Sequence, residues 1–145
     1  MHTPIGETLH RLLHAYKRAM RDGYTTAGID LTVAQIRMIK GIASDPDASA
    51  QAIAKRTRQD KGHIARLIKD LEGEALITRR PHPSDSRYRQ LKLTAAGHAL
   101  ATRIAEVEAE AGARMARHLP DPDIERFVEL AEAMIANLES SENPL

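Results

Sequence analysis

The sequence of 145 residues contains no cysteine and no tryptophan, and its four aromatic residues are three tyrosines and one phenylalanine. The absence of cysteine excludes disulfide bridges, thiolate zinc sites, cysteine nucleophiles and thiol redox sensors. It is also compatible with a reducing cytoplasm, where disulfides are rare. The scarcity of aromatic side chains disfavours proteins that bind single-stranded nucleic acid by stacking bases on aromatic platforms.

Long apolar runs are missing as well. None approaches the roughly 18 residues that a membrane-spanning helix needs, and residues 1–6 lack the basic start and apolar stretch of a secretory signal. We therefore expect a cytoplasmic protein without a membrane partner. The hydrophobic fraction of 42% is ordinary for a globular protein. The length predicts one domain, or one domain with an appended oligomerisation element.

The formal net charge of +1 conceals an uneven distribution along the chain. Residues 1–48 are nearly balanced, with six basic and five acidic side chains. Residues 49–94 carry eleven Lys and Arg against five Asp and Glu, whereas residues 95–145 carry four against ten. A basic segment of this size indicates contact with a polyanion, or else solvated helix faces whose charges happen to be sorted.

Apolar side chains recur at helical spacing along most of the chain, and capping residues mark where the helices begin. Thr32 with Gln35 has the form of a capping box, while Ser49, Asp60 and Thr94 are suitable N-caps. The predicted helices cover approximately residues 4–22, 32–44, 49–57, 60–71, 95–118 and 121–138.

Two short segments change to the alternating period of β-strands. Residues 76–80 and 88–94 are separated by a polar loop with two prolines, which cannot donate hydrogen bonds to a strand ladder. The pattern predicts a two-stranded hairpin. Because an isolated hairpin is not stable in water, it must pack on the preceding helices.

The order of helix, short helix, tight turn, helix and hairpin is that of a winged helix-turn-helix. The apolar stripe of the fourth helix turns inward, which leaves its polar face for the major groove of DNA. Gly62 would allow close approach, and Arg66 could pair with guanine in bidentate fashion. Lys61 and Lys69 could bind phosphates. The residues predicted to contact DNA are Lys61, Gly62, His63, Arg66, Lys69 and, in the hairpin loop, Arg87.

The hairpin loop supplies the second predicted contact. Arg87 would reach a minor groove or a phosphate, and Asp85, two residues earlier, could hold its guanidinium group. The alternative is a small helical bundle with a hairpin and a coincidentally basic surface. The element order, the facing of the fourth helix and the basic segment together favour the DNA-binding interpretation.

Several short motifs in this region occur together in one known family. They are Leu31-Thr32 with Gln35, Asp60-Lys61, Ile64, Arg66-Leu67, Leu71-Glu72, Leu76-Ile77, Arg79-Arg80-Pro81, Asp85-Ser86-Arg87, Leu93-Thr94 and Ala96-Gly97. With these motifs the chain resembles the multiple antibiotic resistance regulator (MarR) family of bacterial transcription factors.

The resemblance implies a mainly α fold with a small two- or three-stranded β-wing, in which a winged helix-turn-helix is flanked by dimerisation helices. Residues 1–30 would form an N-terminal dimerisation helix, residues 31–95 the DNA-binding lobe, and residues 96–145 the C-terminal dimerisation helices. It further implies a homodimer on a palindromic operator, usually a repressor that a small phenolic or other anionic ligand releases.

Four positions depart from the family pattern, and one of them is Gln59, which replaces a usual apolar residue of the turn. Arg58 lies where the family often has glycine in the turn, and Ala75 replaces the glycine that commonly ends the fourth helix. His63 occupies a position where a small hydroxyl residue is usual, so the operator could differ from the common ones.

Dimerisation also has a physical argument. The first helix and the last two carry apolar stripes larger than a winged unit of about 45 residues can cover. A two-fold partner would bury these stripes and place two DNA-reading helices about 34 Å apart, one turn of DNA.

The effector of such a regulator would need polar side chains where the flanking helices meet the lobe. His14, Arg18 and Arg37 could meet a carboxylate or a phenolate, and the alternative is that they are ordinary surface or interface residues.

Metal and catalytic sites are poorly supported. His10 and His14 have the i, i+4 spacing of zinc ligands, but no further ligand obviously joins them. No catalytic, phosphate-binding or dinucleotide-binding motif is present. We therefore expect no enzyme, no metal and no cofactor. The alternative function is a winged-helix protein–protein adaptor that does not bind DNA.

Overall fold

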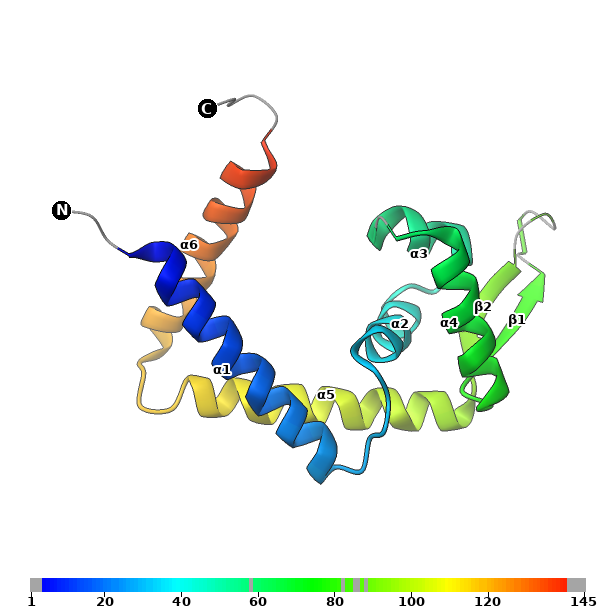
Figure 1. The fold of residues 1–145 in the computed structure, drawn as a ribbon, viewed down its shortest axis with the longest axis horizontal. Helices are drawn as coiled ribbons and strands as arrows, with labels where there is room; N and C mark the ends of the chain where they lie inside the picture. The colour runs from blue at the N-terminus through cyan, green and yellow to red at the C-terminus, as the bar shows by residue number, and fades with distance from the viewer. Residues whose placement is uncertain (1–3, 58, 82, 85–86, 88, 141–145) are drawn as a thin grey trace. The chain divides into compact units, whose positions relative to one another are not determined.

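The computed structural model describes residues 4–57, 59–81, 83–84, 87 and 89–140, and Figure 1 shows the arrangement of their helices and strands. Over these residues the chain forms six helices and one two-stranded antiparallel sheet. The elements are α1 (Ile5–Thr26), α2 (Val33–Ser44), α3 (Ala50–Thr57), α4 (Lys61–Gly73), β1 (Ile77–Pro81), β2 (Arg89–Leu93), α5 (Ala95–Met115) and α6 (Asp121–Glu139). This confirms the predicted fold class.

The chain divides into two compact units, one up to Glu108 and one from Ala109 onward. The first unit contains α1 to α4, the hairpin and most of α5, and the second contains the end of α5 and all of α6. Along the described length of α6 no side chain is buried. Within the described residues, none of the helices combines the length and the apolar character needed to cross a bilayer.

Three of the predicted helix starts are confirmed by their capping hydrogen bonds. The Thr32 side chain accepts from the Gln35 N–H while the Gln35 side chain accepts from the Thr32 N–H, which completes the capping box of α2. The Ser49 hydroxyl caps α3 by accepting from the Ala52 N–H. The Asp60 carboxylate caps α4. Each cap satisfies backbone donors that the first helical turn leaves unpaired.

The core of the first unit forms where α2, α4, the hairpin and α5 each contribute apolar side chains. α4 packs against α2, α3 and β1. The stripe predicted to face inward on α4 is buried throughout. The largest fully buried side chains are Ile39, Ile64, Ile68, Leu71, Leu91 and Ile104.

The hairpin is joined to the start of α3 as well as to α4. The Leu91 N–H donates to the Ala48 carbonyl, and Ser49 forms a single antiparallel bridge with Gln90. The Gln90 side chain is buried, and its amide nitrogen donates to the Pro46 carbonyl over 2.6 Å. Residues 48–49 therefore extend the two-stranded sheet by one bridge, consistent with a two- or three-stranded wing.

α4 ends in a Schellman motif built on an alanine. Ala75 has a φ of 57°, in the left-handed region, where it takes the role of the glycine that the family pattern has at this position. The Ala75 N–H donates to the Glu72 carbonyl and the Leu76 N–H to the Leu71 carbonyl, which satisfies two orphan carbonyls of the helix.

The base of the wing lies against the start of α5. Thr94 is the predicted cap of α5, and its hydroxyl accepts from the Gly97 N–H while donating to the Ala75 carbonyl. A Cβ on Gly97 would lie 2.1 Å from the Leu76 carbonyl oxygen, so only glycine fits there. The glycine of the Ala96-Gly97 motif thus allows helix and wing backbone to touch.

Two predicted helix ends differ from the structure. The first helix was expected to end near residues 22–23, but α1 continues to Thr26. Gly23 lies inside the helix, where a Cβ would approach Val107 of α5 to 2.7 Å, so this glycine serves close packing and does not end the helix. α5 ends at Met115, three residues before the expected position, and His118 follows with a φ of 66°.

Candidate DNA-binding surface

Within the first unit, the polar side of α4 is exposed and accessible to a binding partner. Its apolar side holds Ile64 at 1% and Leu71 at 0% exposure. The predicted contact residues of this helix all lie on the opposite, exposed side. They are Lys61, Gly62, His63, Arg66 and Lys69. A single helix therefore presents three cations and one histidine over little more than two turns, which is the arrangement that a phosphate-lined groove requires.

The first turn of α4 is shaped by Asp60 and Gly62. The Asp60 carboxylate accepts from the Gly62 N–H over 3.3 Å. A Cβ on Gly62 would lie 3.4 Å from that carboxylate, an ordinary contact distance. The backbone therefore does not require glycine at residue 62. The effect of Gly62 is to leave the surface of the first turn of α4 without a side chain.

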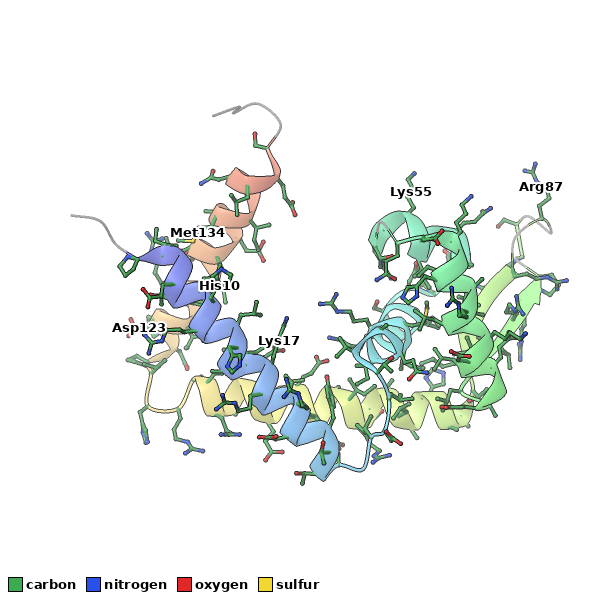
Figure 2. The ribbon with its side chains drawn as sticks, viewed as in Figure 1. His10, Lys17, Lys55, Arg87, Asp123 and Met134 are labelled. Atoms are coloured by element: carbon green, nitrogen blue, oxygen red, sulfur yellow. The ribbon has the colours of Figure 1, made fainter. Side chains whose placement is uncertain are left out.

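The wing contributes the second predicted contact. Arg87 is exposed in the loop between β1 and β2, and Figure 2 shows its side chain projecting from the wing. Its predicted supporting residue, Asp85, lies outside the described residues. At the base of the wing, Arg79 Nη2 lies 2.8 Å from Glu72 Oε1 of α4. This ion pair joins the wing to the end of α4.

Sequence reasoning did not single out two further cations on the same lobe. Lys55 lies in the last turn of α3, and Arg89 is the first residue of β2, paired with Pro81. Both are exposed. Figure 2 shows Lys55 and Arg87 projecting on the same side of the lobe. The only available signal was the basic segment 49–94, which contains them without indicating which way they face.

A metal site at the two N-terminal histidines gains no support. His10 and His14 are both exposed on α1. Throughout the described part of the chain, no three His, Cys, Asp or Glu side chains are grouped closely enough to hold an ion.

None of the three residues predicted for an effector lines the hollow between α2 and α5. His14, Arg18 and Arg37 are exposed, and no hydrogen bond or ion pair within the described residues joins them. A hollow of about 250 Å³ lies between α2 and α5. Its lining residues are Lys40, Ala43, Ser44, Ala101, Ile104, Ala105 and Glu108.

The rim of this hollow carries an ion pair. Lys40 Nζ lies 2.7 Å from Glu108 Oε1 and joins α2 to α5. The pKa of the nearby Tyr24 phenol is raised, mainly because burial disfavours the phenolate and also because the Glu108 carboxylate and Tyr16 repel it. The link between α2 and α5 is therefore electrostatic as well as apolar.

Comparison with known proteins agrees with this geometry. Residues 29–87 match the family model described as the MarR family. The chain is 27% identical over 117 residues to the HTH-type transcriptional repressor IacR of Pseudomonas putida, covering 77% of this chain and 67% of that protein.

Solved structures show the same fold. A mutant of MarR from E. coli complexed with operator DNA has a TM-score of 0.74 at 20% identity, covering 90% of this chain and 93% of that one. A mutant of S. aureus MepR bound to an oligodeoxyribonucleotide has a TM-score of 0.65 at 18% identity, covering 95% and 100%. The MarR family transcription regulator SP03579 has a TM-score of 0.79 at 22% identity, covering 92% and 87%.

The matched residues include α2, α3, α4, β1 and Arg87 of the hairpin loop, and they end before β2. Residues 29–87 of this chain are therefore similar to the MarR family, and a solved structure of a MarR family transcription regulator shares its fold.

Proposed function

We propose that this protein is a sequence-specific, double-stranded DNA-binding transcriptional regulator that acts as a homodimeric repressor on a palindromic operator. The observation that carries the proposal is the exposed cationic face of α4, whose other face is buried in the core. A helix in this state is held rigidly while its polar side chains remain free to enter a major groove. The relatives that bind operator DNA or an oligodeoxyribonucleotide support the same function.

The proposed contacts divide into reading and anchoring. Arg66 is the residue for a bidentate contact to guanine, and His63 the one for a neighbouring base edge. Lys61 and Lys69 are proposed phosphate contacts, with Arg87 in the minor groove or on a phosphate. The function needs no catalytic step and no cofactor, and we propose that it is exercised on chromosomal DNA in the cytoplasm.

The homodimer rests on apolar side chains that each unit leaves exposed. In α1 these include Ile5 at 56% and Leu9 at 58% exposure, and in α6 Phe127 at 51% and Leu138 at 86%. Contiguous exposed apolar stripes of this kind mark interfaces between proteins. A two-fold partner would cover them and would present two copies of α4 to successive turns of one duplex.

Salt dependence tests the DNA-binding proposal. A binding site is first selected from random duplex, and its affinity is then measured across salt concentrations. Neutralised phosphates predict a linear fall of log K with log salt, with a slope of about −0.9 per contact. Arg66→Ala should weaken binding by about 1–3 kcal/mol and relax the preference at one base position. Lys17→Ala, which removes an exposed charge from α1, is the control and should preserve that preference.

The outcomes separate the two candidate functions. If the parent shows no salt-dependent affinity for any duplex, the regulator proposal fails and the adaptor without DNA binding takes its place. If the parent binds but Arg66→Ala leaves the base preference unchanged, the protein reads DNA through other residues.

The dimer is tested by sedimentation equilibrium. The parent should be dimeric at micromolar concentration, and Phe127→Asp should dissociate it because a carboxylate would be desolvated in the interface. Glu132→Ala on the same helix is the control and should leave the dimer intact. A monomeric parent would end the homodimer proposal.

Ligand response is tested separately. Benzoate and phenol are titrated into the operator complex, and a fall in affinity is expected to be reduced in His14→Ala, Arg18→Ala or Arg37→Ala. If neither probe changes the affinity of the parent, aromatic acids and phenols are not its effectors. If all three variants respond like the parent, these side chains do not bind the ligand.

A further inference from the structure

The outer face of α3 is a second polar surface of the lobe. Ile53 and Ala54 point into the core, while Gln51, Ala52 and Lys55 are exposed. α3 is held in place by its contacts with α4 and by the hydrogen bond from Leu91 to the segment that precedes it. Its outer face is therefore fixed relative to the proposed reading helix.

The two cations in the last turn of α3, Lys55 and Arg56, lie in different surroundings. The Arg56 guanidinium lies over Gly41 of α2, with Nη2 only 2.7 Å from the place that a Cβ on Gly41 would take. Arg56 is thus folded back against the lobe. Lys55 instead extends outward on the side from which Arg87 of the wing also projects (Figure 2).

We propose that Lys55 binds a DNA phosphate and anchors the edge of α3 on the strand backbone, a role that rests on the proposed function. With the first turns of α4 and with Arg87, it forms a third point of attachment on one side of the lobe. A lysine suits this role because its ammonium group is a compact charge on a flexible stem, able to follow a phosphate without reading a base. Arg56 is a structural neighbour that contacts α2.

A phosphate contact by Lys55 can be distinguished from a role that is limited to the stability of α3. A cation in the last turn of a helix also interacts favourably with the helix dipole, and this applies equally to Lys55 and Arg56. If that were the whole function of Lys55, its removal would lower the stability of the fold and leave DNA binding unchanged. A phosphate contact predicts the reverse.

The test compares Lys55→Gln with its neighbour Arg56→Gln, which makes the same charge change in the same helical turn. Affinity for the selected site and for random duplex is measured between about 50 and 200 mM salt. A dimer that loses one contact per protomer should show a slope of log K against log salt reduced in magnitude by about 1.8. The fold-loss in affinity should be the same on both duplexes, because a phosphate contact is independent of sequence.

Arg56→Gln should keep the parent slope. The proposal is overturned if Lys55→Gln has the parent slope, or if both variants lose the same slope, since the charge alone would then account for the effect. A denaturant titration of each variant identifies a local role, which would appear as lost stability with unchanged binding. A parent that binds no duplex refutes the regulator function together with this contact, whereas binding with an unchanged slope refutes Lys55 alone.

Discussion

The end of α4 offers a direct test of how the left-handed residue is tolerated. Ala75 adopts a φ of 57° although it carries a Cβ, and a non-glycine residue in this conformation is disfavoured by about 1–2 kcal/mol. Replacement by glycine removes this strain. It also increases the entropy of the unfolded chain, which offsets about 0.4–1 kcal/mol of the gain. Because the Ala75 side chain is exposed, its loss removes no core packing. The expected net effect of Ala75→Gly is a stabilisation of about 0.5–1 kcal/mol.

The measurement is a denaturant titration at fixed protomer concentration, because association would otherwise shift the transition. A series at this position sharpens the result, and the expected order of stability is Gly, Asn, Ala and Val, since asparagine tolerates the left-handed region and a β-branched residue does not. Gly73→Ala is a matched control in the last turn of the helix. Nothing lies within 4 Å of its added Cβ, so the helical alanine should stabilise by about 0.5–1 kcal/mol.

The left-handed backbone at Ala75 is not strained if Ala75→Gly destabilises the protein, or if Ala75→Val unfolds at the same denaturant concentration as the parent. An unchanged m-value is required in either case, because a change in m would indicate that the unfolded state had altered.

Three further predictions follow from the described contacts. Gly97→Ala should destabilise the fold by about 1–3 kcal/mol, measured by denaturation, because its Cβ would overlap the Leu76 carbonyl. Gly62→Ala should stabilise the fold slightly and weaken binding to the selected duplex, since an alanine favours the helix but separates its first turn from DNA; equal or tighter binding would refute close approach at this glycine. The raised pKa of Tyr24 means that the unfolded chain ionises first as pH rises above about 10, so the unfolding free energy should fall there, and Tyr24→Phe should fall less steeply.

The starts of helices were predictable because each depends on a few neighbouring residues. The capping box of Thr32 and Gln35 and the caps at Ser49 and Asp60 are local hydrogen bonds, so the residue types and their spacing are sufficient. The inward stripe of α4 was predictable for the same reason, since its period of 3.6 residues follows from the sequence alone.

The positions that could not be predicted depend on contacts between segments far apart in the sequence. Gly23 was interpreted as a helix end because glycine usually terminates a helix, but Val107, 84 positions later, determines its role. The difference between Lys55 and Arg56 is of the same kind, because it depends on which of two adjacent cations reaches Gly41 of α2. The local sequence around Gly23 and the count of charges over residues 49–94 do not show these contacts.

Contacts between segments that are distant in the sequence also join the wing to α4. The Schellman motif positions the chain that leaves α4, the Thr94 hydroxyl joins that exit to the start of α5, and the ion pair between Arg79 and Glu72 ties β1 back to the helix. An exposed ion pair contributes little stability by itself, but here it adds to the Schellman motif and the Thr94 hydrogen bond, which already restrict the hairpin. Because Arg79 is paired with Glu72, it is unavailable to DNA. The strand cations of the wing are therefore not equivalent. Arg80 of β1 and Arg89 of β2 are exposed strand arginines outside this ion pair, which makes them better candidates than Arg79 for contact with the duplex.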